Sequence, residues 1–211
     1  MNLVQIMQLL LTVSENQTLE IINDMIDFLV EKYPQQLLPY SSELISSMCT
    51  SFLRVSEDEA YDTNNDNSND ATKETKLLGL LDNILTVVIS IPDKQVILDL
   101  NNQLGCVISL VLDNAQLDLV ESVMELVQEI DTKCKQVLNL DAVINSFKNY
   151  GYDYFDYYLG FFQSVYCYGD LKERSTVTEL LGWIVSENPS GFDPDDTEFV
   201  EFLTCLVSEM V

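Results

Sequence analysis

The sequence predicts an all-α fold, a HEAT-repeat (armadillo-like) α-solenoid of about five helical hairpins. Three observations support this fold class. Apolar residues recur at helical spacing nearly everywhere, as in residues 18–32, where one face holds Leu19, Ile22, Ile26 and Leu29. Strand-like alternation of apolar and polar residues is absent from the sequence over any useful length. Turn-forming residues divide the helices into pairs with a period of about 40 residues, which is typical of HEAT-type units.

The expected helices follow one another along a single section that spans residues 1–211. Breakers such as Pro34, Pro92 and Gly151 separate them. The expected ranges are 4–11, 18–32, 41–55, 73–91, 96–112, 116–131, 138–149, 152–168, 171–186 and 195–211. Several of these helices are apolar on more than one side; in residues 18–32, Met25 and Phe28 widen the apolar face. Such a helix needs more than one covering neighbour, which favours stacked hairpins over the alternative of one compact bundle.

Residues 56–72 differ from their surroundings. They read SEDEAYDTNNDNSNDAT and contain no Lys or Arg but six acids: Glu57, Asp58, Glu59, Asp62, Asp66 and Asp70. Such a stretch buries too little apolar surface to offset its ordering entropy, so we expect a disordered acidic loop inside one repeat. Either this loop is a solvated insertion, or it is an acidic arm that contacts a basic partner.

The charge balance excludes several function classes. Ten Lys and Arg stand against 35 Asp and Glu with no His, which gives a net charge of −25. A nucleic-acid-binding protein needs a basic surface, and an anionic membrane would repel this chain, so we expect neither partner. The lack of His removes His-dependent catalytic triads and most zinc sites. No apolar run approaches the ~18 residues of a membrane-spanning helix.

No motif for catalysis, cofactor binding or metal binding is present in the sequence. It has no phosphate-binding loop, dinucleotide fingerprint, hydrolase elbow, metalloprotease motif or calcium loop. Asp193, Asp195 and Asp196 fit the start of a helix better than a cation loop. We therefore expect a non-enzyme without cofactor or metal. Five widely spaced cysteines without a CxxC pair indicate a reducing compartment, and we expect all five to be buried apolar side chains: Cys49, Cys106, Cys134, Cys167 and Cys205.

Acidic stripes run along the second helix of two hairpins. One stripe consists of Glu20, Asp24, Asp27 and Glu31, and the other of Asp118, Glu121, Glu125 and Glu129. Second helices line the concave face of a HEAT array, so these eight residues are candidates for binding a basic cargo protein. The alternative is a solvated face that keeps the protein soluble. The net charge favours the binding interpretation, because it exceeds what solubility requires of a domain of this size.

Aromatic residues concentrate between Phe147 and Tyr168. One helical stripe within this segment holds Tyr154, Tyr158, Phe161, Val165 and Tyr168. We expect the stripe to belong to the core, and a peptide-binding groove edged by tyrosines is the alternative.

Four segments together resemble one protein family. They are residues 149–159, NYGYDYFDYYL; residues 39–55, PYSSELISSMCTSFLRV; residues 76–88, KLLGLLDNILTVV; and residues 103–127, QLGCVISLVLDNAQLDLVESVMELV. They resemble the importin-seven and importin-eight branch of the β-karyopherins, over most of residues 36–170. The Asn-rich loop suggests a fungal member of that branch.

The resemblance implies a HEAT-repeat nuclear transport receptor that moves between cytoplasm and nucleus. Such a receptor carries basic cargo, such as ribosomal proteins or histones, and releases it when Ran-GTP binds. The resemblance also implies that this chain is a middle-to-late section of a longer receptor, whose full length contacts Ran-GTP and nucleoporins. No Ran-binding or nucleoporin-binding residue is assigned here. The alternative function is a HEAT-repeat scaffold subunit or an acidic chaperone for basic proteins.

Overall fold

The computed structural model describes residues 3–16, 20–57, 67–114, 117–150 and 155–187. Within these ranges the secondary structure is helical throughout, so the all-α prediction is confirmed for this part of the chain. The elements are α1 (Leu3–Asn16), α2 (Glu20–Lys32), α3 (Pro34–Leu37), the 3-10 turn η1 (Leu38–Tyr40), α4 (Ser41–Glu57), α5 (Asn67–Ser90), α6 (Lys94–Asp113), α7 (Leu117–Cys134), α8 (Leu140–Tyr150), α9 (Phe155–Tyr168) and α10 (Leu171–Glu187). The helix expected over residues 195–211 lies outside the described residues.

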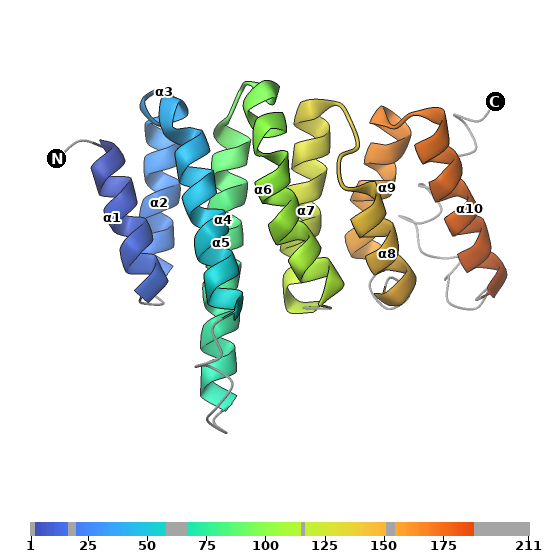
Figure 1. The fold of residues 1–211 in the computed structure, drawn as a ribbon, viewed down its shortest axis with the longest axis horizontal. Helices are drawn as coiled ribbons and strands as arrows, with labels where there is room; N and C mark the ends of the chain where they lie inside the picture. Colours follow the sequence, from blue (N-terminus) through green and yellow to red (C-terminus); the bar gives the residue numbers. More distant parts are fainter. Residues whose placement is uncertain (1–2, 17–19, 58–66, 115–116, 151–154, 188–211) are drawn as a thin grey trace.

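The helices stand side by side in two layers (Figure 1). The front layer contains α1, α4, α6 and α8, and the back layer contains α2, α5, α7 and α9. Neighbours in each layer contact one another, the layers contact through α1–α2, α4–α5 and α6–α7, and α10 packs against α9. A helix such as α7 is therefore covered by α5, α6 and α9, which explains why the sequence makes it apolar over more than one side.

Local sequence signals set several helix ends. Asp93 is the N-cap of α6, where its side chain accepts a hydrogen bond of 2.9 Å from the main-chain N–H of Gln95. At the start of α10, the Glu173 N–H donates to Asp170 Oδ1 at 2.8 Å and the Asp170 N–H donates to Glu173 Oε2 at 2.7 Å. This reciprocal pair is a capping box, and it satisfies two N–H groups that the helix itself leaves without a partner.

Two boundaries differ from the expected ones. Ser56 and Glu57 end α4, and residues 67–72 begin α5, so both ends of the expected acidic loop are helical. Figure 1 shows the α4–α5 pair projecting beyond the other hairpins. Extending a helix by a residue costs far less than starting one, which accounts for continuation into polar sequence. Asp58, Glu59, Asp62 and Asp66 lie outside the described residues, so the loop between these helices stays a prediction.

Short helical turns also replace an expected break. Pro34 is the first residue of α3, and Pro39 lies in the first turn of η1. Proline fits the first turn of a helix because its missing N–H would have no partner there and its φ is already helical. The two prolines therefore begin short helical turns between α2 and α4, where the sequence alone predicts only a connection.

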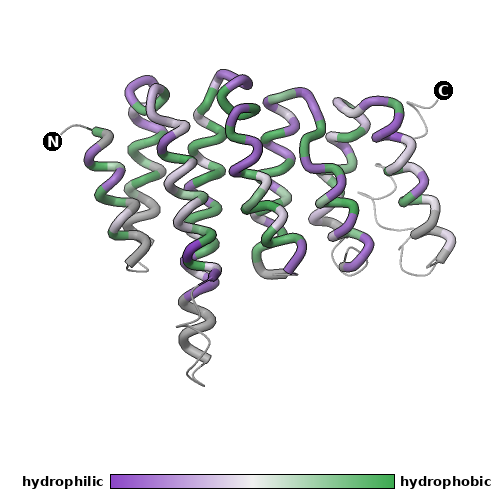
Figure 2. The backbone as a smooth tube through the Cα atoms, in the orientation of Figure 1, coloured by the Kyte–Doolittle hydropathy of each residue, from purple (hydrophilic) through white to green (hydrophobic). Residues whose placement is uncertain are grey.

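The core runs between the layers and between neighbouring hairpins. Figure 2 shows hydrophobic stretches along the helices and hydrophilic ones at several of the turns. Near α8 and α9 the core is aromatic: the ring of Phe147 meets those of Tyr158 and Phe162 edge-on, with centroids 5.0 and 4.9 Å apart. The hydroxyls of Ser146 and Tyr158 share a buried hydrogen bond of 2.8 Å. The core interpretation of this segment is therefore confirmed for Tyr158, Phe161 and Val165, all of which are buried.

The cysteines divide between core and surface. Cys49 and Cys134 are buried as expected, whereas Cys106 and Cys167 are exposed, which corrects the expectation for those two. Apolar periodicity assigns a helix to the core but leaves open which of its positions a neighbour covers. Cys205 lies outside the described residues.

Candidate protein-binding surface

The two acidic stripes lie on helices of the same layer. They occupy α2 and α7, and α5 stands between them. Glu31, Glu121 and Glu125 have exposed side chains. Since α5, α6 and α9 contact α7, its exposed residues face away from the front layer. Four further candidates lie on these two helices, but their side chains are outside the described part of the structure: Glu20, Asp24, Asp27 and Asp118.

Glu129 has a cationic partner within the fold. Its Oε1 lies 3.6 Å from the ammonium of Lys133, one turn further along α7. The same ammonium donates hydrogen bonds to the main-chain oxygens of Ile89, at 2.6 Å, and Ile91, at 3.1 Å. Lys133 thereby satisfies carbonyls at the carboxyl end of α5, where the helix dipole favours a positive charge. Glu129 helps to position this lysine, so its charge is partly neutralised within the fold.

The back layer also presents residues that the sequence analysis missed. Asp82 of α5 is exposed between the two stripes, but α5 has no acidic stripe that would single it out. Met25 and Phe28 of α2 are 46% and 58% exposed, and Ile89 of α5 is 53% exposed. The expectation that Met25 and Phe28 are covered by neighbouring helices is therefore wrong. Large apolar side chains at the surface offer contact area to a partner that charge alone does not.

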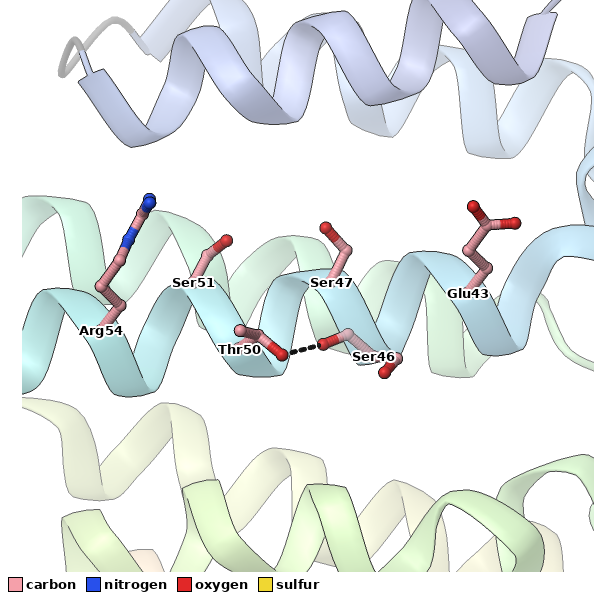
Figure 3. Close-up of a pocket in the computed structure, with 6 residues that line it drawn as sticks. All are labelled: Glu43, Ser46, Ser47, Thr50, Ser51 and Arg54. Carbon is pink, nitrogen blue, oxygen red and sulfur yellow. Dashed lines mark hydrogen bonds between the residues drawn. The ribbon is translucent and has the colours of Figure 1, made fainter.

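A separate groove runs along α4 in the front layer (Figure 3). Its volume is about 390 Å³ and its lining is largely hydroxylic: Glu43, Ser46, Ser47, Thr50, Ser51 and Arg54. Figure 3 shows Glu43 and Arg54 at opposite ends of the groove, both pointing toward the side of α4 where α1 lies. Gln8 of α1 donates a hydrogen bond of 2.9 Å to Glu43 Oε1, so one end is already engaged within the fold. The groove contains none of the candidate cargo-binding residues.

Of the acidic segment that joins α4 and α5, the structure describes only the two ends. Glu57 is exposed in the last turn of α4. Asp70 belongs to α5, but its side chain is outside the described set. The projecting end of the α4–α5 pair is therefore where this segment begins and ends, away from the middle of the acidic stripes (Figure 1).

The buried thiols are poorly suited to chemistry. Burial raises the pKa of Cys49 to about 12, with a smaller contribution from Cys106 and an opposing one from a backbone hydrogen bond. Burial also raises the pKa of Cys134. Both thiols are therefore protonated at neutral pH, whereas a nucleophile or a metal ligand must be a thiolate. Among the described residues, no three His, Cys, Asp or Glu side chains gather in a way that could hold a metal ion.

One described helix, α6, is long and apolar enough to cross a membrane by length and composition alone. In the fold it packs against α4, α7 and α8. A helix in the core of a helical array passes the same test, so this is weak evidence for a membrane segment.

The comparisons with known proteins add no assignment. No family model matches the chain, and no curated protein or solved structure matches it. The arrangement of the helices and the chemistry of their exposed faces are therefore the basis of the proposed function.

Proposed function

We propose that this chain is part of a HEAT-repeat (armadillo-like) α-solenoid that binds basic proteins, within a nuclear transport receptor of the β-karyopherin family. Its cargo is of the ribosomal-protein or histone type, and Ran-GTP binding to the full-length receptor regulates the release of that cargo. The receptor moves between cytoplasm and nucleus and contacts nucleoporins through its full length. The chain acts by binding and not as an enzyme.

The order of helix contacts supports the solenoid. The first four hairpins begin at residues 3, 41, 94 and 140. Each back-layer helix contacts the back-layer helix of the next hairpin, from α2 to α5, from α5 to α7 and from α7 to α9. Stacked repeats give this pattern of nearest-neighbour contacts, and a compact bundle around one shared core does not require it. Small-angle scattering should show an elongated particle, and the scattering profile of a compact sphere would contradict the solenoid.

The exposed back-layer face is the observation that carries the binding proposal. Glu31, Asp82, Glu121 and Glu125 are exposed on three adjacent helices of a chain with a net charge of −25. Such a face attracts Lys- and Arg-rich proteins, speeds their association at low salt and weakens as salt screens the charges. Charge alone gives little selectivity, and the exposed Met25, Phe28 and Ile89 supply apolar contacts that would improve it.

The test compares two variants with the same change in charge. The first is Glu121→Gln with Glu125→Gln on the back layer. The control is Asp99→Asn with Asp141→Asn, two exposed acids on the front-layer helices α6 and α8. The dissociation constant of a core histone heterodimer would be measured by fluorescence anisotropy at low and physiological ionic strength. We expect the back-layer variant to lose more affinity than the control. Equal losses would show that only net charge matters and would refute a defined surface.

A second experiment separates a transport receptor from a scaffold or an acidic chaperone. The full-length receptor is loaded with the same histone heterodimer and then mixed with Ran-GTP. Transport predicts release of the heterodimer, since Ran-GTP and cargo would have unfavourable coupling. A scaffold or chaperone predicts that Ran-GTP leaves the complex intact, and that outcome would overturn the transport assignment while preserving the binding surface.

A further inference from the structure

At the carboxyl end of α7, the carboxyl group of Asp131 is buried. Asp131 is 0% exposed. Its Oδ1 accepts a hydrogen bond of 3.1 Å from the main-chain N–H of Leu138, seven residues further along. Its Oδ2 is buried without a hydrogen-bond partner. A buried polar atom without a partner costs free energy, and a buried charge without one costs much more, so the protonation state of this group matters to the fold.

Asp131 closes the connection between α7 and α8 with both its side chain and its main chain. Besides the Leu138 contact, its main-chain oxygen accepts a hydrogen bond of 3.3 Å from the N–H of Gln136. Between them, Lys135 has φ 52°, a left-handed conformation that non-glycine residues seldom adopt. Two hydrogen bonds from the connection thus end on Asp131. No other connection in the described residues combines a positive φ with two hydrogen bonds to one acidic residue.

The charged groups around Asp131 favour its neutral form. Glu173 of α10 is the acid that acts on it, and the capping box of α10 holds that carboxylate in place. Lys133 is bonded to α5 and to Glu129, and Lys94 of α6 acts with Lys133 on the thiol of Cys134. The last turns of α5 and α9 contain no basic residue, and the connection to α8 presents the Leu138 amide.

Burial raises the pKa of Asp131 to about 7; the Leu138 hydrogen bond lowers this pKa and Glu173 raises it. In the unfolded chain an aspartate has a pKa of about 3.9. Between that pH and about pH 7, the folded state therefore keeps the proton on Asp131, whereas the unfolded chain has released it. Stabilisation of the closed connection is complete below the unfolded pKa and declines as pH rises through the folded pKa.

We propose that Asp131 is a proton-dependent latch on the α7–α8 connection: its neutral carboxyl group keeps the connection closed, and rising pH removes the proton and opens the connection to water. The latch joins the hairpin α6–α7 to the hairpin α8–α9, so it sets how firmly successive hairpins are coupled. It depends on the packing at the end of α7 and is independent of what the acidic surface binds.

Hydrogen exchange at the Leu138 amide tests the latch directly. After correction for the intrinsic rate, its protection should fall by up to about tenfold per pH unit between roughly pH 5 and pH 7, and should level off above that. The core amide of Cys49 in α4 serves as an internal reference for global unfolding. Asp131→Asn keeps the Oδ1 acceptor but cannot ionise, so its Leu138 protection should not change with pH.

Two further variants sharpen the test. Glu173→Gln keeps an acceptor for the Asp170 N–H but removes the like charge, so protection should level off at lower pH than in the wild type. Asp141→Asn, an exposed acid on α8, should keep the wild-type profile. The latch is refuted if wild-type Leu138 protection is independent of pH, or if Asp131→Asn keeps the wild-type dependence. Should Asp131→Asn fail to fold, the wild-type measurement still decides, because Leu138 protection that does not change with pH refutes the latch.

Discussion

Replacement of Gly169 by alanine tests the packing at the end of α9. Gly169 is buried, and its N–H donates a hydrogen bond of 2.8 Å to the main-chain oxygen of Val165. A methyl group added here would clash with that same oxygen and would lie 3.2 Å from Glu173 Oε2. Because the nearest atom belongs to the backbone, no side-chain rotation relieves the clash, and the last turn of α9 must open.

The expected cost follows from what the last turn would lose. Overpacking and a weakened hydrogen bond together cost about 1–3 kcal/mol. The reduced entropy of the unfolded chain returns roughly 0.4–1 kcal/mol when glycine becomes alanine. Taking the middle of both ranges, Gly169→Ala should lower the free energy of unfolding by roughly 1.3 kcal/mol, and by no more than about 2.6 kcal/mol.

Gly182 provides the matched control on the neighbouring helix. It is exposed within α10, and an added methyl group would meet nothing within 4 Å. Gly182→Ala should stabilise the protein by up to about 1 kcal/mol through helix propensity. Urea denaturation followed by circular dichroism measures the stability of both variants. We expect the midpoint urea concentration to shift while the dependence of the free energy on urea stays constant. If Gly169→Ala is as stable as Gly182→Ala, the clash with the Val165 carbonyl does not exist.

Three further predictions concern the core and the thiols. Lys133→Met should lower the free energy of unfolding in urea by about 1–2 kcal/mol, because the carbonyls of Ile89 and Ile91 lose a charged donor; an unchanged midpoint would contradict this. Tyr158→Phe should cost about 1 kcal/mol, and adding Ser146→Ala should cost less than the sum of the single changes, because the shared hydrogen bond is then already lost. Iodoacetamide mapped by mass spectrometry should label the exposed thiols before the buried ones, Cys106 and Cys167 before Cys49 and Cys134; early labelling of Cys49 would show that its site opens.

The sequence predicts what local chemistry decides. Helical periodicity, the breaker at Pro92 and the cap at Asp93 place α6 within a residue or two of its observed ends, because each signal acts over a single turn. The same signals place the start of α5 too late, at residue 73 instead of Asn67. Polar residues are compatible with both a loop and an exposed helix. At residues 67–72 the helix is favoured, because these residues extend a helix that has already formed.

The candidate surface shows where local reasoning ends. Spacing correctly groups Glu121 and Glu125 on one exposed side of α7, because period alone decides which residues share a helix face. Spacing wrongly predicts that Met25 and Phe28 are buried, because burial depends on which neighbouring helix lies against that side of α2. The partners of Lys133 are 44 and 42 residues away in the chain, so no local pattern could identify them.

Two acids at the end of α7 illustrate how packing assigns different roles to similar residues. Glu129 and Asp131 stand two residues apart and therefore point to different sides of the helix. Glu129 remains partly in water and pairs with Lys133 at 3.6 Å. Asp131 turns inward, where Leu138 supplies a single hydrogen bond and Glu173 adds a like charge. The sequence shows two acids in an acidic chain, whereas the fold makes one a partner of the lysine that binds α5 and the other a buried group whose proton stabilises the next connection. Since both effects act at the same end of α7, a change to either residue should alter how this helix is joined to its neighbours.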